Sequence, residues 1–537
     1  MVEWLAGNRI RGTNAERTST TGFNPVAGVT GGWKELGRTT LSNTPTGTAD
    51  YTAGSTSYGT GDSGSAVDLQ TQVGSTLGNS WTLRFKLTMT SKANNLIFMV
   101  QDINTIDETT TRDGIGLRQT ASTSYYDLEG CNGTAPTGGQ YDHRFTTTPA
   151  IDTKYVQITR VSETSASIQF WNSTYTTVSE SSDNIPIADI TNLRYFVIYN
   201  NGSAFTIDEV SFWNNSASTG ASDTIDVSSL ADKRYLMFLL DSRSNGTAIS
   251  TTWKANGSTG NEYSFRRNHD GTETDANTQP SAATSWTSIV TNAFGVGYAA
   301  NMSGKEKLFL EHEVYQNTAG ANAAPTRTEN AFKWSGTDVI DQLTMHNSSS
   351  GDIVSGSELV VLGFDPDDTH TTNFWEELAS VDWSSGGSIS SGTFTPKKYL
   401  CVQGWYKNAA DTGYLQLRVG NSTVDPNPNY ANRYNHNGTI PDPTPETGNN
   451  IILPNVTNTS ASGANGFFNS FIINNASNEK LVINHHVLRG GSGAGSAPDR
   501  VECVSKWANT SNQINIIEML RNTNNFTAGQ IKVWGSD

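Results

Sequence analysis

The stretch HEVYQ at residues 312–316 differs by one residue from HExxH, a motif in which two histidines and a glutamate serve a zinc ion. The second histidine is missing, and the surrounding segment alternates at period two, which predicts a strand rather than a helix. On that strand Leu308, Leu310, His312 and Val314 share one mainly apolar face. His312 is therefore either a metal ligand or catalytic base, or a buried histidine that is hydrogen-bonded in the core. We favour the buried histidine, because one imidazole alone rarely supports a metal site.

Two matching segments, RRNHDG at 266–271 and RYNHNG at 433–438, contain further histidines and arginines. Arg266 and His269 in the first, and Arg433 and His436 in the second, could line binding loops, because loops often carry binding residues. The alternative is that Asn and Gly form a turn while the histidines and arginines bond nearby carbonyl groups. We expect the turn and keep the four residues as ligand-binding candidates.

Three aspartates, Asp365, Asp367 and Asp368, lie close together and offer the oxygen ligands that Ca²⁺ prefers. The spacing of an EF-hand loop is absent, and Asp-Pro-Asp-Asp is also typical of a turn. The segment is therefore either a calcium site or an ordinary turn, and no other cofactor is expected.

Four aromatic residues are candidates for contact with sugars, because a pyranose presents an apolar C–H face that packs on an aromatic ring. Trp253 and Trp405 lie early in two related segments, and Tyr125 and Tyr126 lie in an irregular stretch. Packing in a core is the alternative role for each tryptophan.

The second half of the chain repeats itself. The stretch EKLFLEHEV at 306–314 is matched by EKLVINHHV at 479–487, and KRYL at 233–236 by KKYL at 397–400. The order of these and other matches is kept, so a whole domain is duplicated, and each copy is long enough for its own core.

Alternating segments rich in Thr and Ser predict that both copies are β-sandwiches. We place the first at 229–365 and the second at 394–537. The linker between them, 366–393, contains FWEELASV at 374–381, which we predict as a short helix capped by Asn373.

The region before the duplication is also rich in strand patterns. The segments 81–89 and 193–199 predict strands, and 154–161 with 166–171 predict a hairpin. They indicate an all-β domain at 46–215.

Two segments flank that domain. The N-terminal arm at 1–45 is either an anchoring segment or a first strand that caps the next domain. A linker follows the domain at 216–228 and is rich in Asn, Ser and Thr.

The strand pair NLRYFVIYN at 192–200 and FTIDEVSFWN at 205–214 resembles the end of concanavalin A-like, laminin-G-type jelly-roll domains, over about residues 67–215. This resemblance implies a two-sheet sandwich, often glycan-binding and sometimes with Ca²⁺. Some enzymes on this fold hydrolyse polysaccharides with acids spaced Glu-x-Asp-x-x-Glu on one strand, a spacing not found here. The duplicated modules, which close on SGSELVVLG or AGQIKVWG, resemble β-sandwich modules of structural and fibre proteins of marine tailed viruses.

The composition narrows the classes of partner. The chain has 537 residues, a net charge of −16 and a pI of about 4.9, which argues against nucleic acid and anionic membranes. Its three cysteines do not match between the copies, so we expect free thiols. We expect no secretory leader at the N-terminus and no membrane insertion, because no apolar run approaches membrane length.

Together these features predict an all-β chain of three β-sandwich, jelly-roll-like domains in tandem, the last two homologous by internal duplication. We expect a non-enzymatic viral structural protein, a fibre, spike or capsid-surface component located in the virion. It would form homo-oligomers, contact other virion proteins and bind host-surface glycans. The alternative is an extracellular or cell-surface adhesin or carbohydrate-binding protein of a marine microbe. A polysaccharide-degrading enzyme comes third and would need two carboxylates roughly 5–9 Å apart in a cleft.

Overall fold

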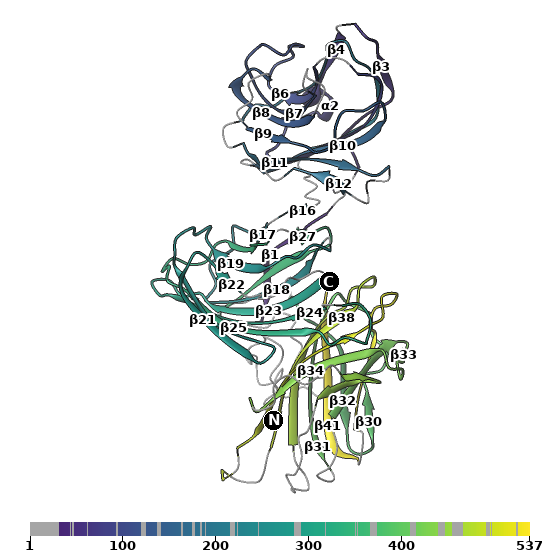
Figure 1. Cartoon of the computed structure of the whole chain (residues 1–537). Helices are drawn as coiled ribbons and strands as arrows, with labels where there is room; N and C mark the ends of the chain where they lie inside the picture. The colour runs from purple at the N-terminus through teal and green to yellow at the C-terminus, as the bar shows by residue number, and fades with distance from the viewer. Residues whose placement is uncertain are drawn as a thin grey trace. The chain divides into compact units, whose positions relative to one another are not determined.

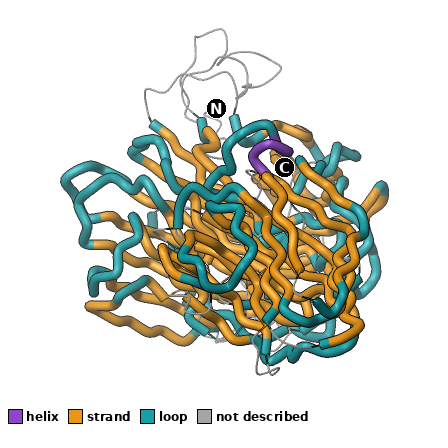
Figure 2. The backbone as a smooth tube through the Cα atoms, turned by 90° about the horizontal axis from the view of Figure 1, so that it is seen from above, coloured by secondary structure: helices purple, strands orange, loops and turns teal. Residues whose placement is uncertain are grey.

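The computed structural model describes residues 32–537 apart from internal stretches. Those stretches are 43–44, 46–47, 62, 93–94, 120–124, 137–140, 163–164, 174, 176–177, 183–184, 188–189, 215–220, 223, 245, 284–290, 317, 350, 352, 366–372, 409–414, 439–445, 454–464, 490–493, 496 and 522–524. The described residues form antiparallel strands and one short helix, α2 (Leu69–Val73), drawn in purple among the orange strands of Figure 2. The prediction of an all-β chain is confirmed.

The chain divides into two compact units, and each is described by itself. One runs from Leu41 to Ser222. The other joins the residues up to Thr40 with Asp223–Asp537, so the first unit is inserted into the sequence of the second. The segment 216–228, predicted as a linker, contains a strand of the second unit, β17 (Thr224–Val227).

The inserted unit consists of two sheets. Its strands are β2 (Tyr51–Ala53), β3 (Thr56–Tyr58), β4 (Ser63–Asp68), β5 (Trp81–Ser91), β6 (Leu96–Gln101), β7 (Arg112–Gln119), β8 (Tyr126–Thr134), β9 (Tyr141–Arg144), β10 (Thr153–Ser162), β11 (Ser165–Trp171), β12 (Val178–Ser181), β13 (Ile185–Pro186), β14 (Tyr195–Asn200), β15 (Ala204–Asn214) and β16 (Ala221–Ser222). One sheet has the order β12-β11-β10-β5-β15-β2, with β13 beside β11 and β3 beside β15. The other has the order β4-β14-β6-β7-β8-β9, and the short strand β16 belongs to neither sheet.

A single apolar core lies between these two sheets, because alternate residues of each strand point inward. Phe85 of one sheet packs against Phe98 and Phe196 of the other, with ring centroids 4.9 and 6.1 Å apart. The predicted hairpin is confirmed as β10 and β11, and the two predicted strands at 81–89 and 193–199 correspond to β5 and β14.

The first copy of the duplication, here called sandwich 1, also has two sheets. Its strands are β1 (Lys34–Thr40), β17, β18 (Tyr235–Arg243), β19 (Thr251–Ala255), β20 (Tyr263–His269), β21 (Thr272–Gln279), β22 (Ala282–Ala283), β23 (Asn292–Ala300), β24 (Lys307–Tyr315), β25 (Thr326–Trp334), β26 (Leu343–Asn347), β27 (Ile353–Val354) and β28 (Glu358–Phe364). The large sheet has the order β1-β28-β18-β23-β24-β25-β20-β21, and the small sheet β17-β26-β19-β22, while the short strand β27 belongs to neither.

The second copy, sandwich 2, repeats this plan. Its strands are β29 (Glu376–Trp383), β30 (Ser388–Ser390), β31 (Tyr399–Asn408), β32 (Leu415–Asn421), β33 (Thr423–Val424), β34 (Tyr430–His436), β35 (Glu446–Gly448), β36 (Ile451–Leu453), β37 (Asn465–Ile473), β38 (Lys480–Leu488), β39 (Asp499–Trp507), β40 (Ile516–Arg521) and β41 (Phe526–Ser536). The large sheet has the order β29-β41-β31-β37-β38-β39-β34-β35, which matches that of sandwich 1 strand for strand. Figure 1 labels β31, β34, β38 and β41 of this sheet. The small sheet is β30-β40-β32-β33, with β36 beside β32.

The predicted helix at 374–381 is wrong, because most of it forms β29, which pairs with β41. Its counterpart is β1, which pairs with β28 and so makes part of the N-terminal arm the edge strand of sandwich 1. The sequence carries this match as WKEL at 33–36 and WEEL at 375–378. Glu and Leu favour helices locally, but pairing with a sheet edge outweighs so weak a preference. Residues 1–31 of the arm lie outside the described residues.

The orientation of β24 corrects the prediction that His312 points into the core of its sandwich. Leu308, Leu310 and His312 point to the outer face of sandwich 1, and the two leucines are 60% and 57% exposed. Glu311 and Glu313 point into the sandwich instead. They are tolerated there because Trp253 Nε1 donates to Glu311 at 2.7 Å and the Tyr315 hydroxyl donates to Glu313 at 2.6 Å.

The outer faces of the two large sheets pack against each other. Buried side chains of both sandwiches form one apolar cluster there: Trp33, Met237, Leu239, Phe294, Val296, Val314, Val360, Leu362, Phe374, Trp375, Tyr399, Cys401, Phe471, Ile473, Leu481, Ile483, Val504 and Trp534. This contact joins the duplicated sandwiches into one unit, and the candidate site lies within it.

Candidate functional site

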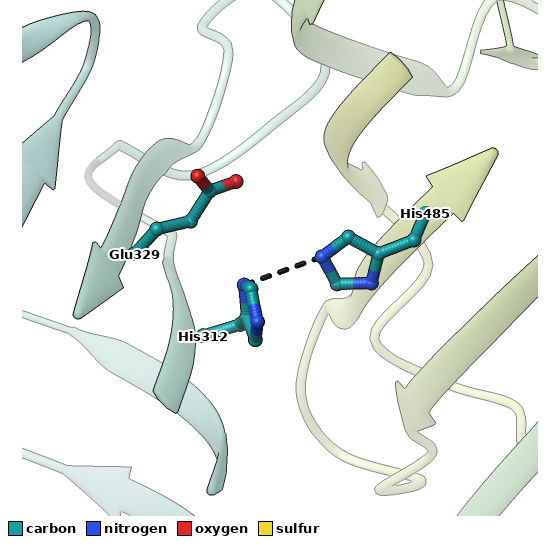
Figure 3. A group of neighbouring side chains, drawn as sticks. All are labelled: His312, Glu329 and His485. Carbon is teal, nitrogen blue, oxygen red and sulfur yellow. Dashed lines mark hydrogen bonds between the residues drawn. The ribbon is translucent and has the colours of Figure 1, made fainter. Parts of the chain in front are cut away.

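His312, Glu329 and His485 meet where the two large sheets pack (Figure 3). His312 on β24 and Glu329 on β25 are neighbours across the ladder, and His485 comes from β38 of sandwich 2. Nδ1 of His312 lies 3.2 Å from Nε2 of His485, and the ligand atoms of the three residues all lie within 4.8 Å of one another. The packing thus brings together two histidines that occupy equivalent positions in the duplicated sequence.

Both imidazoles of this cluster are neutral near pH 7. Burial lowers the pKa of His312 to about 4, and burial together with the neighbouring His312 ring lowers the pKa of His485 to about 3. Two neutral rings can share a hydrogen bond, in which one nitrogen donates and the other accepts. The nearby Arg327 guanidinium lies 2.5 Å from Glu329 Oε1 and 3.2 Å from Glu502 Oε2, and so links the sandwiches a second time.

Two neutral imidazoles and a carboxylate are a donor set that suits zinc. The geometry favours another role. The guanidinium of Arg327 already binds the Glu329 carboxylate, and the surrounding side chains leave no space for a water molecule. The arrangement therefore fits a hydrogen-bonded, charge-paired contact between the sandwiches better than a metal centre.

An open groove lies elsewhere on the outer face of the large sheet of sandwich 2. It has a volume of about 410 Å³ and is lined by Trp405, Phe467, Val487 and Pro498, with Asn465 and Arg489 among its polar residues. Phe467 and Val487 are each 42% exposed, and Trp405 is half-buried. Among the sequence candidates, Trp405 is therefore placed where a ligand or partner can reach it.

Two of the aromatic candidates, Trp253 and Tyr126, lie in apolar cores, so neither ring is open to a sugar at the surface. Trp253 is 1% exposed, packs on Phe238 and donates to the buried Glu311. Tyr126 is fully buried in the core of the inserted unit, where its ring packs against Phe170. Both point inward because alternate residues of a strand face opposite sides.

Tyr125 lies just before β8 and is half-buried. The Arg144 guanidinium lies 3.8 Å from the centroid of its ring, a cation–π contact. Nε of the same arginine lies 3.2 Å from the Asp127 carboxylate. Aromatic, cationic and anionic groups thus meet at one place on the inserted unit.

The expected Asn and Gly turns follow His269 and His436, but the four candidate residues themselves lie on strands, within β20 and β34, and not in loops. Asn268 and Asn435 each accept a hydrogen bond from the backbone of the glycine three residues later. His269 accepts from or donates to Thr328 at 3.1 Å, and burial lowers its pKa to about 4. His436 is buried, 3.5 Å from Asp499.

The two arginines of these segments differ in their surroundings. Arg433 donates to the Pro325 carbonyl at 2.8 Å and lies 3.3 Å from Asp270, so it belongs to the contact between the sandwiches. Its counterpart Arg266 is exposed. The difference shows that equivalent residues of the two copies do not have equivalent partners.

The aspartate cluster lies partly outside the described residues, which include Asp365 but neither Asp367 nor Asp368. Asp365 accepts a hydrogen bond from the Arg234 backbone and is within 3.7 Å of the Lys233 and Arg234 side chains. Two cations at this carboxylate favour an ion-paired strand end over a calcium ligand.

The groove residues Phe467 and Val487 are functional candidates that the sequence interpretation missed. Their period-two pattern was visible, but a strand pattern does not say which apolar face another domain covers. The three cysteines are buried free thiols, as predicted. Among the described residues, no helix is long and apolar enough to span a membrane.

Comparisons with known proteins give distant likenesses only. No protein-family model matches the chain, and no curated protein matches it. Among solved structures, a Ruminococcus gnavus sialidase CBM40 domain is 14% identical over 32% of this chain and 95% of its own, with a TM-score of 0.23. The LG4-5 domains of the mouse laminin alpha1 chain are 12% identical over 60% of this chain and 93% of their own, with a TM-score of 0.21. Likenesses this weak carry no argument about function, which must come from the site itself.

Proposed function

We propose that the chain is a non-enzymatic structural protein of a viral surface, a fibre, spike or capsid-surface component of the virion. It assembles from copies of itself, contacts other virion proteins and binds host-surface glycans. The observation that carries this proposal is the exposure of apolar side chains on the outer faces of both sandwiches. Patches of this kind on folded domains mark binding surfaces.

The carboxylates of the described residues support a binding role over hydrolysis. Glu311 and Glu313 lie close together, and both are fully buried inside sandwich 1. A polysaccharide cannot reach them there. Asp127 and Glu129 share a face of β8, but Arg144 binds the first at 3.2 Å and Arg118 the second at 3.3 Å. General acid and base catalysis on a glycosidic bond needs two carboxylates facing a cleft.

The glycan contact is assigned to Tyr125 and Arg144 of the inserted unit. A tyrosine ring offers an apolar surface to a sugar, and the adjacent Arg144 guanidinium, which is 57% exposed, offers hydrogen bonds to its hydroxyl groups, while the buried Asp127 holds that guanidinium in place. The three groups are already held in place by contacts with one another, so binding costs little ordering.

Glycan binding is tested with the purified chain on an array of host-surface glycans, followed by calorimetry on any hit. We expect Tyr125→Ala and Arg144→Ala to weaken binding at least tenfold, as loss of a central contact does. Tyr195→Ala is the matched control, because Tyr195 also lies beside an arginine, Arg194, with the guanidinium 5.1 Å from its ring. Glycan binding that is unaffected by the first two variants contradicts the assignment.

The location is tested separately, by labelling native particles with an antibody against sandwich 2 and imaging them. Label on virions supports the structural role. Label on the surface of uninfected microbial cells supports the adhesin instead, because the same binding surfaces serve either protein.

A further inference from the structure

Each large sheet carries two rows of outward residues that cross the same four strands, one row near each end. Paired positions across the ladders define row A as Tyr235, Ala300, Leu308 and Lys333 in sandwich 1 and Tyr399, Ile473, Leu481 and Lys506 in sandwich 2. The same registers define row B as Asp241, Phe294, Val314 and Arg327 in sandwich 1 and Trp405, Phe467, Val487 and Arg500 in sandwich 2.

The contact inside the chain joins row A of sandwich 2 to row B of sandwich 1. The Tyr399 ring lies 6.3 Å from the Phe294 ring. Lys398, next to Tyr399, lies 3.4 Å from Asp241 and 2.9 Å from Glu358. All eight residues of these two rows are buried.

The two remaining rows are open. In row A of sandwich 1, Leu308 is 60% exposed and Tyr235 is 38% exposed, although their counterparts Leu481 and Tyr399 are fully buried. In row B of sandwich 2, Phe467 and Val487 are exposed, although Phe294 and Val314 are buried. The internal contact is therefore heterologous, because each copy uses a different end of the same face and leaves the other end unpaired.

We propose that a second copy of this chain covers the open rows, with row A of sandwich 1 in one copy packing on row B of sandwich 2 in the next. This continues between chains the contact that already exists within the chain. A heterologous contact of this kind builds a ring if its rotation closes and a filament if it does not.

The apolar partners of the internal contact are kept in the open rows. Leu308 and Tyr235 occupy the positions equivalent to Leu481 and Tyr399. The groove around Phe467 and Val487 is equivalent to the surface that Phe294 and Val314 form in the internal contact. Burying these apolar side chains stabilises the contact by about 20–30 cal/mol for each Å² of apolar surface removed from water.

The charged partners of the internal contact are not kept. Trp405 replaces Asp241 and Gln530 replaces Glu358, so the open row B lacks the carboxylates that bind Lys398. The residue equivalent to Lys398 is Arg234, whose guanidinium would meet the indole of Trp405 in a cation–π contact. The contact between copies is thus weaker than the internal one and reversible.

The interface adds detail to the assembling role proposed above and rests on that role, while glycan binding is independent of it.

The test uses sedimentation velocity of the full chain at rising concentration. Leu308→Asp of row A, with Leu310→Asp at the next outward position of β24, disables the open end of sandwich 1, and Phe467→Asp with Val487→Asp disables row B of sandwich 2. All four side chains are exposed, so the fold is retained, which thermal unfolding checks. Ile151→Asp, at a side chain 69% exposed on the inserted unit, is the matched control.

We expect the wild type and the control to associate, and each double variant alone to stay monomeric. An equimolar mixture of the two double variants should form a one-to-one dimer, because each supplies the row that the other lacks. A mixture that stays monomeric while the wild type associates overturns this interface and leaves the assembling role standing. A wild type that is monomeric up to roughly 100 μM overturns both.

Discussion

At the scale of single residues, the most unusual group is the buried carboxyl of Glu311. Burial, with the neighbouring Glu313, raises its pKa well above the ordinary value for glutamate. Folding therefore favours the protonated form, so this residue costs stability as the pH rises above about 4.3, where the unfolded chain ionises. A neutral side chain of the same shape avoids that cost.

We predict that Glu311→Gln keeps or raises stability at pH 7, by about 1 kcal/mol. Its amide can donate to Asn330, whose Oδ1 has no hydrogen-bond partner among the described residues, while its oxygen still accepts from Trp253. Glu311→Ala should cost about 2–4 kcal/mol, because it leaves a cavity and two donors without acceptors. Urea unfolding at pH 7 measures both, and an equal loss in the two variants would contradict the protonated state.

The paired histidines predict a dependence on acid. The folded pKa values of His312 and His485 lie below the unfolded value of about 6.5, so their contribution is complete above that pH and is lost as the pH falls toward 4. At pH 5 the loss is about 2 kcal/mol for each histidine. His485→Gln keeps a hydrogen-bonding side chain without the titration.

The comparison is thermal unfolding of wild type and His485→Gln from pH 7 to 4.5. We expect the variant to lose less stability than the wild type over this range. Other buried histidines, such as His486, contribute equally to both proteins, so parallel curves would show that the pair does not titrate as described.

At the scale of elements, Glu358 links its own strand, β28, to β1 at the edge of sandwich 1 and to β31 of sandwich 2. Its carboxylate accepts from Thr40 of β1 and from the Tyr399 hydroxyl of β31, and it lies 3.3 Å from Arg38 and 2.9 Å from Lys398. Burial alone would raise its pKa, but Lys398 and the hydrogen bonds hold the pKa below the ordinary value. Its stabilising effect is therefore present above about pH 4.3 and is lost at lower pH.

We predict that Glu358→Ala costs about 3–5 kcal/mol, because it leaves partly buried cations without their counter-charge. Amide exchange should rise in β1 and β31 together. Glu518→Ala in β40, a carboxylate 3.9 Å from Arg418, serves as the control for loss of a carboxylate paired with an arginine. Loss of protection in β1 alone would show that the sandwiches are held together without Glu358.

The elements also show what the sequence can and cannot predict. Segments with a period of two predicted the strands, and the conserved order of matching fragments predicted the duplication. Both features can be recognised along the sequence without knowledge of contacts between distant residues. The segment FWEELASV was assigned to a helix because Glu and Leu have favourable helix propensities, whereas its partner in the sheet, β41, is over 140 residues away. The outer position of His312 was missed because both faces of β24 carry apolar or bonded residues, and no local pattern shows which face a second domain covers.

At the scale of the whole molecule, the excess of acidic residues opposes self-association. Each copy carries a formal charge of −16, so two copies repel each other at low ionic strength. The open rows meet through apolar side chains, whose contribution does not depend on screening in this way.

We therefore predict that association strengthens when salt rises from about 0.05 to about 0.5 M, as the Debye length shortens from roughly 14 to 4 Å. Sedimentation at the two salt concentrations measures this directly. A tighter complex at low salt would mean that ion pairs, and not the apolar rows, hold the copies together.

The insertion of residues 41–222 after β1 has a consequence for synthesis on the ribosome. Arg38 and its partner Glu358 are 320 residues apart, so at roughly 5–20 residues per second β1 waits about 16–64 s for β28 to be made. During that interval the inserted unit can fold by itself, while an unpaired edge strand precedes it and invites wrong pairing with nascent neighbours. Translation speed downstream of residue 222 is therefore expected to influence how much of this protein reaches its native state.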